Sequence, residues 1–141
     1  MSEENKALIR TVTDEIWNAR RLERIPELYS PDYVADYRPT APLRSGHDGI
    51  RSMVERAWAT FPDYHEELHR LIAEGDLVVA WFTISGTQQG AWGMLPPSGK
   101  RVSFEEIVIL RVAEGRVAWQ RGVVDNLTAL RQLGVLPTPP T

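Results

Sequence analysis

The sequence contains no cysteine, which excludes disulfides, thiolate nucleophiles and thiolate metal sites. It has no apolar run near the length of about twenty residues that a membrane helix needs. Basic clusters are also absent, and the 16 lysine and arginine residues are outnumbered by 19 acidic residues, for a net charge of −3. We therefore expect no membrane and no nucleic acid among the partners of this protein.

Signals of export, of nucleotide binding and of serine hydrolysis are missing as well. The N-terminal residues MSEENKALIR are acidic and polar, whereas a secretory signal is basic and then apolar, which favours a cytoplasmic protein. No glycine-rich phosphate loop, Walker motif or Gly-x-Ser-x-Gly motif occurs. His65 and His69 fall in a predicted strand, where this spacing separates them by roughly 13 Å, so we expect no metal site.

The composition that remains is that of an ordinary globular protein. The 141 residues are 43% hydrophobic and 25% charged, and this length is sufficient for one core. We expect residues 1–136 to form a single domain and residues 137–141 to be a frayed tail.

Two kinds of periodicity divide the chain. Apolar residues recur every three or four positions over residues 5–19, 22–29, 50–58 and 127–133, which predicts helices there. Apolar and polar residues alternate in four further segments, which predicts strands over residues 64–73, 77–88, 101–113 and 116–125. Turn signals between these segments indicate an antiparallel meander. The order predicts an α+β fold, a curved antiparallel sheet wrapped around the N-terminal helices, with a cone-shaped pocket inside.

The register of the last hairpin decides which side chains face that pocket. A two-residue turn at Glu114-Gly115 would pair Val108 with Arg121 and place three ionisable groups on the inner face. These groups are Glu106, Arg121 and Asp125. Two acids that share one guanidinium can have their pKa values pushed apart, which suits acid/base catalysis.

Other interpretations of these residues remain open. Glu106 and Arg121 would also make a structural ion pair, while Asp125 would cap the last helix. A register slip of one residue would exchange the faces and turn another polar set inward: Glu105, Arg111 and Gln120.

The opposite face of the sheet is also rich in apolar residues. Ile107, Ile109 and Val124 would lie there, and an antiparallel sheet with one wet face should alternate more cleanly. We therefore expect a homodimer that covers this outer face. Trp81, Trp92 and Trp119 lie in the sheet or the long loop, where they would form either an aromatic ligand wall or part of the core.

The sequence resembles the SnoaL-like polyketide cyclase family, within the nuclear transport factor 2-like (cystatin-like) fold. The resemblance rests on IWNARRLERIPELYSPDYV near the N-terminus, on the stretch from IRSMVERAW to SGKRVSF, and on LRVAEGRVAWQRGVVDNLTALRQLG. The order of FPD, EGD, GT, PPSGKR, EGR and DNLTALRQLG within these stretches is specific to the family.

The resemblance implies an α+β cone, usually a homodimer, with an apolar pocket and no metal or organic cofactor. Its type members close a polyketide ring by intramolecular aldol condensation, and their general acid/base aspartate corresponds to Asp125. Family members often have histidine where this chain has Asp36 and Gln88, and a His-Trp pair where it has Gln120-Arg121.

We accordingly expect a cofactor-independent enzyme that closes or isomerises an apolar carbonyl compound, with Asp125, Arg121 and Glu106 as catalytic residues. Six further residues are expected to contact the ligand: Tyr33, Asp36, Trp81, Trp92, Met94 and Trp119. Two alternatives remain. The same acid-arginine-acid group would suit an epoxide hydrolase of this superfold, and the cone would also suit a protein that binds a small ligand without turnover.

Overall fold

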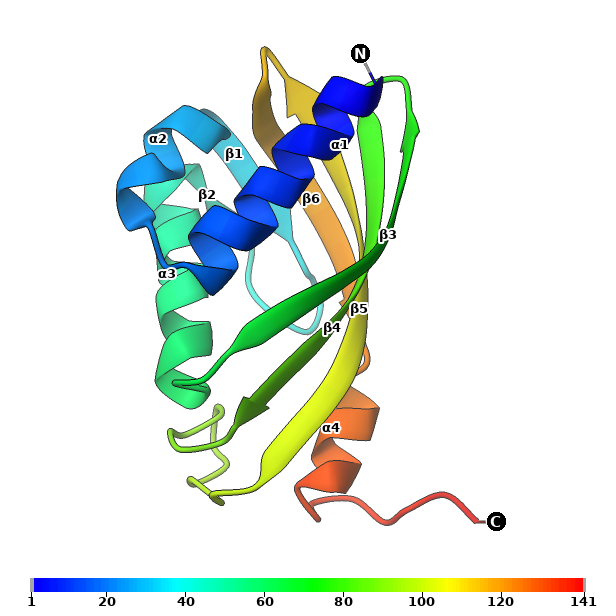
Figure 1. The fold of residues 1–141 in the computed structure, drawn as a ribbon. Coiled ribbons are helices and arrows are strands. Elements are labelled where there is room, and N and C mark those ends of the chain that lie inside the picture. Colours follow the sequence, from blue (N-terminus) through cyan, green and yellow to red (C-terminus); the bar gives the residue numbers. More distant parts are fainter. Residues whose placement is uncertain (1, 141) are drawn as a thin grey trace.

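The computed structural model describes residues 2–140, which form one curved, six-stranded sheet with the helices that precede residue 61 on its concave side (Figure 1). In chain order the elements are α1 (Ser2–Thr11), a π-helix (Val12–Asn18), a 3-10 helix (Leu22–Arg24), α2 (Ile25–Leu28), β1 (Tyr29–Asp36), β2 (Arg44–Ser45), α3 (Gly46–Thr60), β3 (His65–Glu74), β4 (Leu77–Thr87), β5 (Arg101–Ala113), β6 (Arg116–Val124) and α4 (Asn126–Gln132). The predicted α+β architecture is confirmed.

The strands follow the order β2-β1-β6-β5-β4-β3. The predicted meander of β3 to β6 is antiparallel throughout. The sequence did not predict β1, which adds to β6 in parallel and makes the sheet mixed. The helix expected to reach Tyr29 ends at Leu28, and the strand that follows contains Pro31 and an irregular register before Val34. Proline cannot donate to a ladder, so β1 lacks a regular strand pattern.

Strand β5 shows the predicted alternation over its whole length. Its odd-numbered residues are exposed on the outer face, and its even-numbered residues from Val102 to Val112 are buried against the helices. The interior face therefore contains one acid, Glu106, within an apolar row. This part of the face assignment is confirmed.

The turn between β5 and β6 is the predicted two-residue hairpin. Glu114 and Gly115 both have positive φ values, 53° and 74°, as a type I′ turn requires. Ala113 pairs with Arg116 as expected. The first residues of both strands therefore follow the predicted register.

A β-bulge at Ala118 then changes the register of β6. Arg121 pairs with Ile109 instead of Val108, so the predicted pairing is wrong beyond the bulge. One extra residue on a strand reverses the direction of every side chain after it. After the bulge, the residues on the inner side of β6 are Gln120, Gly122 and Val124.

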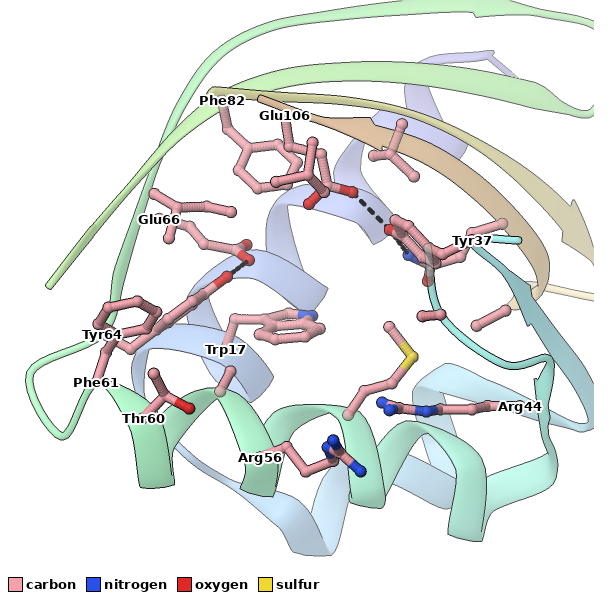
Figure 2. A pocket seen from close by; sticks show the side chains of 18 of the residues that line it. Trp17, Tyr37, Arg44, Arg56, Thr60, Phe61, Tyr64, Glu66, Phe82 and Glu106 are labelled. Atoms are coloured by element: carbon pink, nitrogen blue, oxygen red, sulfur yellow. Dashed lines mark hydrogen bonds between the residues drawn. The ribbon is translucent and has the colours of Figure 1, made fainter. Parts of the chain in front are cut away.

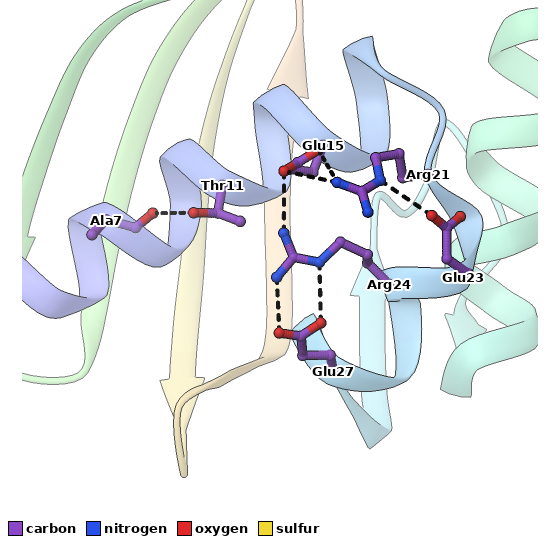
Figure 3. Close-up of polar contacts among 7 residues, drawn as sticks. All are labelled: Ala7, Thr11, Glu15, Arg21, Glu23, Arg24 and Glu27. Atoms are coloured by element: carbon purple, nitrogen blue, oxygen red, sulfur yellow. Dashed lines mark hydrogen bonds and ion pairs between the residues drawn. The ribbon is translucent and has the colours of Figure 1, made fainter.

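A cluster of charged side chains joins the π-helix to the short helices that follow it (Figure 3). Glu15 forms ion pairs with Arg21 at 3.2 Å and with Arg24 at 3.3 Å. Arg24 also pairs with Glu27 at 2.8 Å, and Arg21 with Glu23 at 3.1 Å. Because exposed ion pairs contribute little to stability, the effect of this cluster is to hold the chain reversal between the two helical segments.

The C-terminal helix α4 begins directly after β6 and packs against β5. Gly134 follows it with a φ of 78°, the left-handed conformation that ends many helices, as the sequence indicated. Residues 137–140 form neither helix nor strand. Within residues 2–140, no helix combines the length and the hydrophobicity that crossing a membrane requires.

Candidate active site

A cavity of about 560 Å³ lies between the concave face of the sheet, the N-terminal helices and α3 (Figure 2). This volume is in the range of sites for small organic molecules. Most of its wall is apolar or aromatic. The polar residues of the wall include Tyr37, Arg44, Arg56, Thr60, Tyr64, Glu66, Glu106 and Gln120.

Glu106 reaches the cavity from β5. Its side chain is buried, and burial raises its pKa from 4.5 to about 7. The Tyr37 hydroxyl donates to Glu106 Oε2 at 2.5 Å and acts against this shift, because it stabilises the carboxylate. Oε1 of Glu106 has no hydrogen-bond partner among residues 2–140 and is accessible from the cavity. The side chain can therefore exchange a proton with a ligand near neutral pH.

A directed chain of hydrogen bonds orients Tyr37. The Tyr33 hydroxyl donates to Gln120 Oε1 at 2.5 Å, and Gln120 Nε2 donates to the Tyr37 oxygen at 2.8 Å. Because the Tyr37 oxygen accepts from Gln120, its hydrogen is directed to Glu106. The chain thereby makes Glu106 an acceptor, which favours the carboxylate over the acid.

Gly122 leaves the space that this contact occupies. A Cβ atom at this position would lie 2.7 Å from Tyr37 Cε2 and 2.8 Å from the Tyr37 hydroxyl, and it would overlap Glu106 Oε2. Real Cβ atoms do not approach other atoms so closely. Tyr37 can therefore contact Glu106 on β5 only because Gly122 of β6 has no side chain.

Glu66 is the second acid of the cavity and lies on β3. It accepts a hydrogen bond from the Tyr64 hydroxyl at 2.5 Å (Figure 2). Burial raises its pKa from 4.5 to about 8, and the charge of Glu106 adds to the increase. Its backbone lies two strands from that of Glu106, a separation of roughly 10 Å across the sheet.

The π-helix holds the strand segment that carries Glu66. Asn18 Nδ2 donates to the Glu66 carbonyl at 2.9 Å, and the Glu66 backbone N–H donates to Asn18 Oδ1 at 2.8 Å. An amide side chain here completes two backbone hydrogen bonds of an edge strand. Trp17, the preceding residue, faces the cavity and packs against Tyr64 with 5.6 Å between ring centroids.

Two predicted catalytic residues lie outside the cavity. Arg121 is exposed on the outer surface because of the bulge in β6. Asp125 is exposed and caps α4, where its carboxylate accepts from the Thr128 N–H at 3.1 Å and from the Thr128 hydroxyl at 2.6 Å. The prediction that Glu106, Arg121 and Asp125 face one pocket is wrong. The helix-cap alternative for Asp125 is confirmed.

Arg121 has a different acidic partner from the one expected. It pairs with Asp36 at 3.2 Å, and Asp36 also pairs with Arg38 at 2.9 Å. The Arg38 hydrogen bond lowers the pKa of Asp36 to about 2. Asp36 forms ion pairs with both arginines and does not line the cavity. Its predicted contact with a ligand in the cavity is therefore not formed.

Of the other residues predicted to contact the ligand, one lines the cavity and the rest do not. Trp92 lines the cavity and stacks on Phe104 at 6.1 Å between centroids. Trp81 lies on the outer face and donates from Nε1 to Glu105 at 2.8 Å. Three further residues are absent from the cavity wall: Tyr33, which acts through the hydrogen-bond chain described above, the half-buried Trp119, and Met94, which is fully exposed.

Sequence reasoning missed four of the polar residues that face the cavity: Tyr37, Arg44, Arg56 and Glu66. Glu66 had a local signal, because Tyr64 and Leu68 on either side share its strand face. Arg56 had one too, since it lies three residues after Met53 on α3. Tyr37 and Arg44 belong to the loop region around β2, where no periodicity predicts direction.

Comparisons with known proteins identify the family and relatives of this chain. The sequence profile of the SnoaL-like polyketide cyclase family matches residues 7–133. A relative, the nogalonic acid methyl ester cyclase of Streptomyces nogalater, is 27% identical over 119 residues, which are 84% of this chain and 89% of that protein.

Solved structures share the fold over nearly the whole chain. AclR from Streptomyces galilaeus is 30% identical with a TM-score of 0.85, covering 100% of this chain and 87% of its own. IdmH from Streptomyces antibioticus is 28% identical with a TM-score of 0.82, covering 93% of this chain and 99% of its own. An epoxide hydrolase of the LEH-like type from M. tuberculosis covers 94% of this chain and 90% of its own, with a TM-score of 0.74 at 15% identity, which shows the fold alone.

The curved sheet, the apolar cavity on its concave side and the two buried acids of that cavity define a small-molecule enzyme of the α+β cone type. With its match over residues 7–133, the chain belongs to the SnoaL-like polyketide cyclase family. The predicted family and the predicted enzyme of polyketide cyclase type are thereby confirmed.

Proposed function

We propose that this protein closes a ring of a polyketide by intramolecular aldol reaction, with Glu106 as general base and Glu66 as general acid. The observation that carries the proposal is the pair of buried carboxyl groups on one apolar cavity, with pKa values raised to about 7 and about 8. Two such groups can hold different protonation states at the same pH.

Glu106 suits the role of base. Its pKa is the lower of the two, and Tyr37 stabilises its ionised form. Its free oxygen is accessible to a ligand in the cavity. Glu66 suits the role of acid because it remains largely protonated at neutral pH, when Glu106 has begun to ionise.

The reaction follows from these two states. Glu106 removes a proton from the carbon next to a carbonyl group, and the electron pair of that C–H bond forms an enolate. The enolate carbon attacks a second carbonyl carbon of the same molecule, so that a C–C bond forms and the C=O π bond breaks. The resulting alkoxide takes a proton from Glu66. Exchange with water then returns the proton from Glu106 to Glu66.

Turnover of nogalonic acid methyl ester, the compound for which the relative is named, tests the proposal. Glu106→Gln keeps the shape of the side chain and removes the proton acceptor, so we expect turnover to fall by about two to four orders of magnitude. Glu105→Gln, on the exposed face of the same strand, is the matched control and should remain fully active. Wild-type protein that binds this compound and never turns it over would favour the alternative of a non-catalytic binding protein.

A second proposal concerns assembly: the outer face of the sheet joins two copies of the chain. Trp81, Ile107, Ile109 and Val123 are exposed there as large apolar side chains on three neighbouring strands. Val124, which was predicted for this face, lines the cavity instead. Sedimentation should give twice the chain mass of 16.0 kDa for the wild type and a monomer for Ile107→Lys. A monomeric wild type at micromolar concentration would contradict it.

The cytoplasmic location expected from the N-terminal sequence remains a prediction.

A further inference from the structure

Two arginines face the cavity from the side opposite the acids. Arg44 comes from β2 and Arg56 from α3, and Figure 2 shows both across the cavity from Glu66 and Glu106. Arg44 is half-buried, and removing a guanidinium from water is unfavourable when no carboxylate compensates for the lost solvation. Among the arginines of residues 2–140, only Arg44 and Arg56 line the cavity.

Neither Arg44 nor Arg56 forms an ion pair with any of residues 2–140, although the wall of the same cavity contains two acids. The acids of the cavity do not neutralise them either, since Glu66 and Glu106 bind the hydroxyls of Tyr64 and Tyr37. The cavity therefore has a cationic wall that faces two carboxyl groups held away from it.

The two guanidinium groups also act on each other. Burial lowers the pKa of Arg44, and the neighbouring charge of Arg56 lowers it further. This arrangement is unfavourable while the cavity holds no anion. A bound anion would relieve both effects, because it replaces lost solvation and separates the like charges.

From this geometry we infer that Arg44 and Arg56 bind a free carboxylate of the substrate and thereby orient its carbonyl groups toward Glu106. The inference rests on the proposed function, since it specifies the substrate class of the same cavity. A planar carboxylate matches the fork of a guanidinium, which can donate two parallel hydrogen bonds to it. Nogalonic acid methyl ester, the compound for which the Streptomyces nogalater relative is named, has no such charge.

Binding of anthraquinone-2-carboxylate and of its methyl ester tests the inference without requiring turnover. Trp17 and Trp92 line the cavity, so quenching of tryptophan fluorescence reports occupancy. We expect the wild type to bind the carboxylate at least roughly tenfold more tightly than the ester, in keeping with charge-assisted hydrogen bonds. Added salt should reduce this preference.

The variants Arg44→Gln and Arg56→Gln should each lose roughly tenfold in affinity for the carboxylate and little in affinity for the ester. Arg51→Gln, on α3 but outside the cavity wall, is the matched control and should bind like the wild type. Arg56 is exposed, so its replacement leaves the core intact. If Arg44→Gln does not fold, Arg44→Lys, which retains the positive charge, takes its place in the measurement.

Equal affinity of the wild type for carboxylate and ester would overturn the inference, and so would unchanged carboxylate binding in Arg56→Gln. Failure of the proposed function looks different. In that case the arginine-dependent preference persists, while neither nogalonic acid nor its methyl ester is cyclised. Glu106→Gln should keep the carboxylate preference, because Glu106 is not part of the anion site.

Discussion

The Tyr37 hydroxyl donates to Oε2 of Glu106 at 2.5 Å, although 69 positions separate the two residues in the chain. Tyr37 follows β1 and Glu106 belongs to β5, and β6 lies between these strands. The contact spans β6 because Gly122 has no side chain at the crossing point. A parallel strand pairing and one glycine thus permit the hydrogen bond that acts against the burial-induced rise in the pKa of the candidate base.

Gly122→Ala should therefore disable the site. Its Cβ would collide with Tyr37 and with Glu106 Oε2, so the carboxylate must move. We expect turnover to fall by about a hundredfold and stability to fall by about 1–3 kcal/mol from overpacking. Kinetics and urea unfolding measure the two effects. Full activity in the Gly122→Ala variant would contradict the geometry.

The rate of cyclisation should depend on pH in two steps. Glu106 must be ionised, so the rate rises as the pH passes about 7, and Glu66 must be protonated, so it falls as the pH passes about 8. Steady-state kinetics between about pH 5.5 and about pH 9.5, a range that covers the pKa values of both groups, measures this profile. In Glu66→Gln the decrease at high pH should disappear from the residual rate. A rate that does not change across this range would exclude both assignments.

Folding stability should also respond to Glu66. Because its pKa in the folded protein is raised to about 8 from 4.5, its contribution to stability is fully present below pH 4.5 and is lost as the pH rises toward 8. Glu66→Gln removes this loss, since an amide does not ionise. The variant should gain stability relative to the wild type as the pH rises, by at most roughly 1.4 kcal/mol per pH unit.

Urea unfolding at about pH 5, 7 and 9 measures this gain, because these values span most of the interval from 4.5 to about 8 and extend beyond its upper end. Glu67→Gln is the matched control, because Glu67 is the exposed neighbour on β3. The stability difference between the control and the wild type should stay constant with pH. The prediction fails if Glu66→Gln and Glu67→Gln behave alike.

Asp125 distinguishes the helix-cap role from the catalytic role that the family resemblance implies. Asn caps helices about as well as Asp, so Asp125→Asn should retain stability, whereas Asp125→Ala should lose about 1 kcal/mol. Both variants should keep their turnover, because the carboxylate binds Thr128 on the exposed side of the sheet. A loss of activity by orders of magnitude in Asp125→Asn, with unchanged unfolding, would return this residue to the mechanism.

Local patterns predicted most elements of this fold. The helical spacing before residue 60 and the alternation of β3 to β6 are properties of neighbouring residues, so they can be recognised without the rest of the chain. The placement of Glu106 inside and Glu105 outside follows from the same alternation. Within β5 no irregularity interrupts it, and the prediction was correct to the last residue.

The prediction of the site failed where alternation was interrupted. The bulge at Ala118 has no signature in the sequence AEGRVAWQRG, and it reverses Arg121 and Gln120. Trp17 lies on an apolar helical stripe, a pattern that indicates a core residue, yet that stripe borders a cavity. A stripe of apolar residues has the same appearance whether it faces packed side chains or a ligand site.

The sequence by itself determined the fold class, the family and one of the two acids. Only the tertiary structure decided which polar groups meet. Tyr37 reaches Glu106 through the parallel pairing of β1 with β6, and Glu66 joins the same cavity from the far edge of the sheet. Secondary structure depends on interactions between residues a few positions apart, whereas a carboxyl group's pKa depends on every element that removes water from around it.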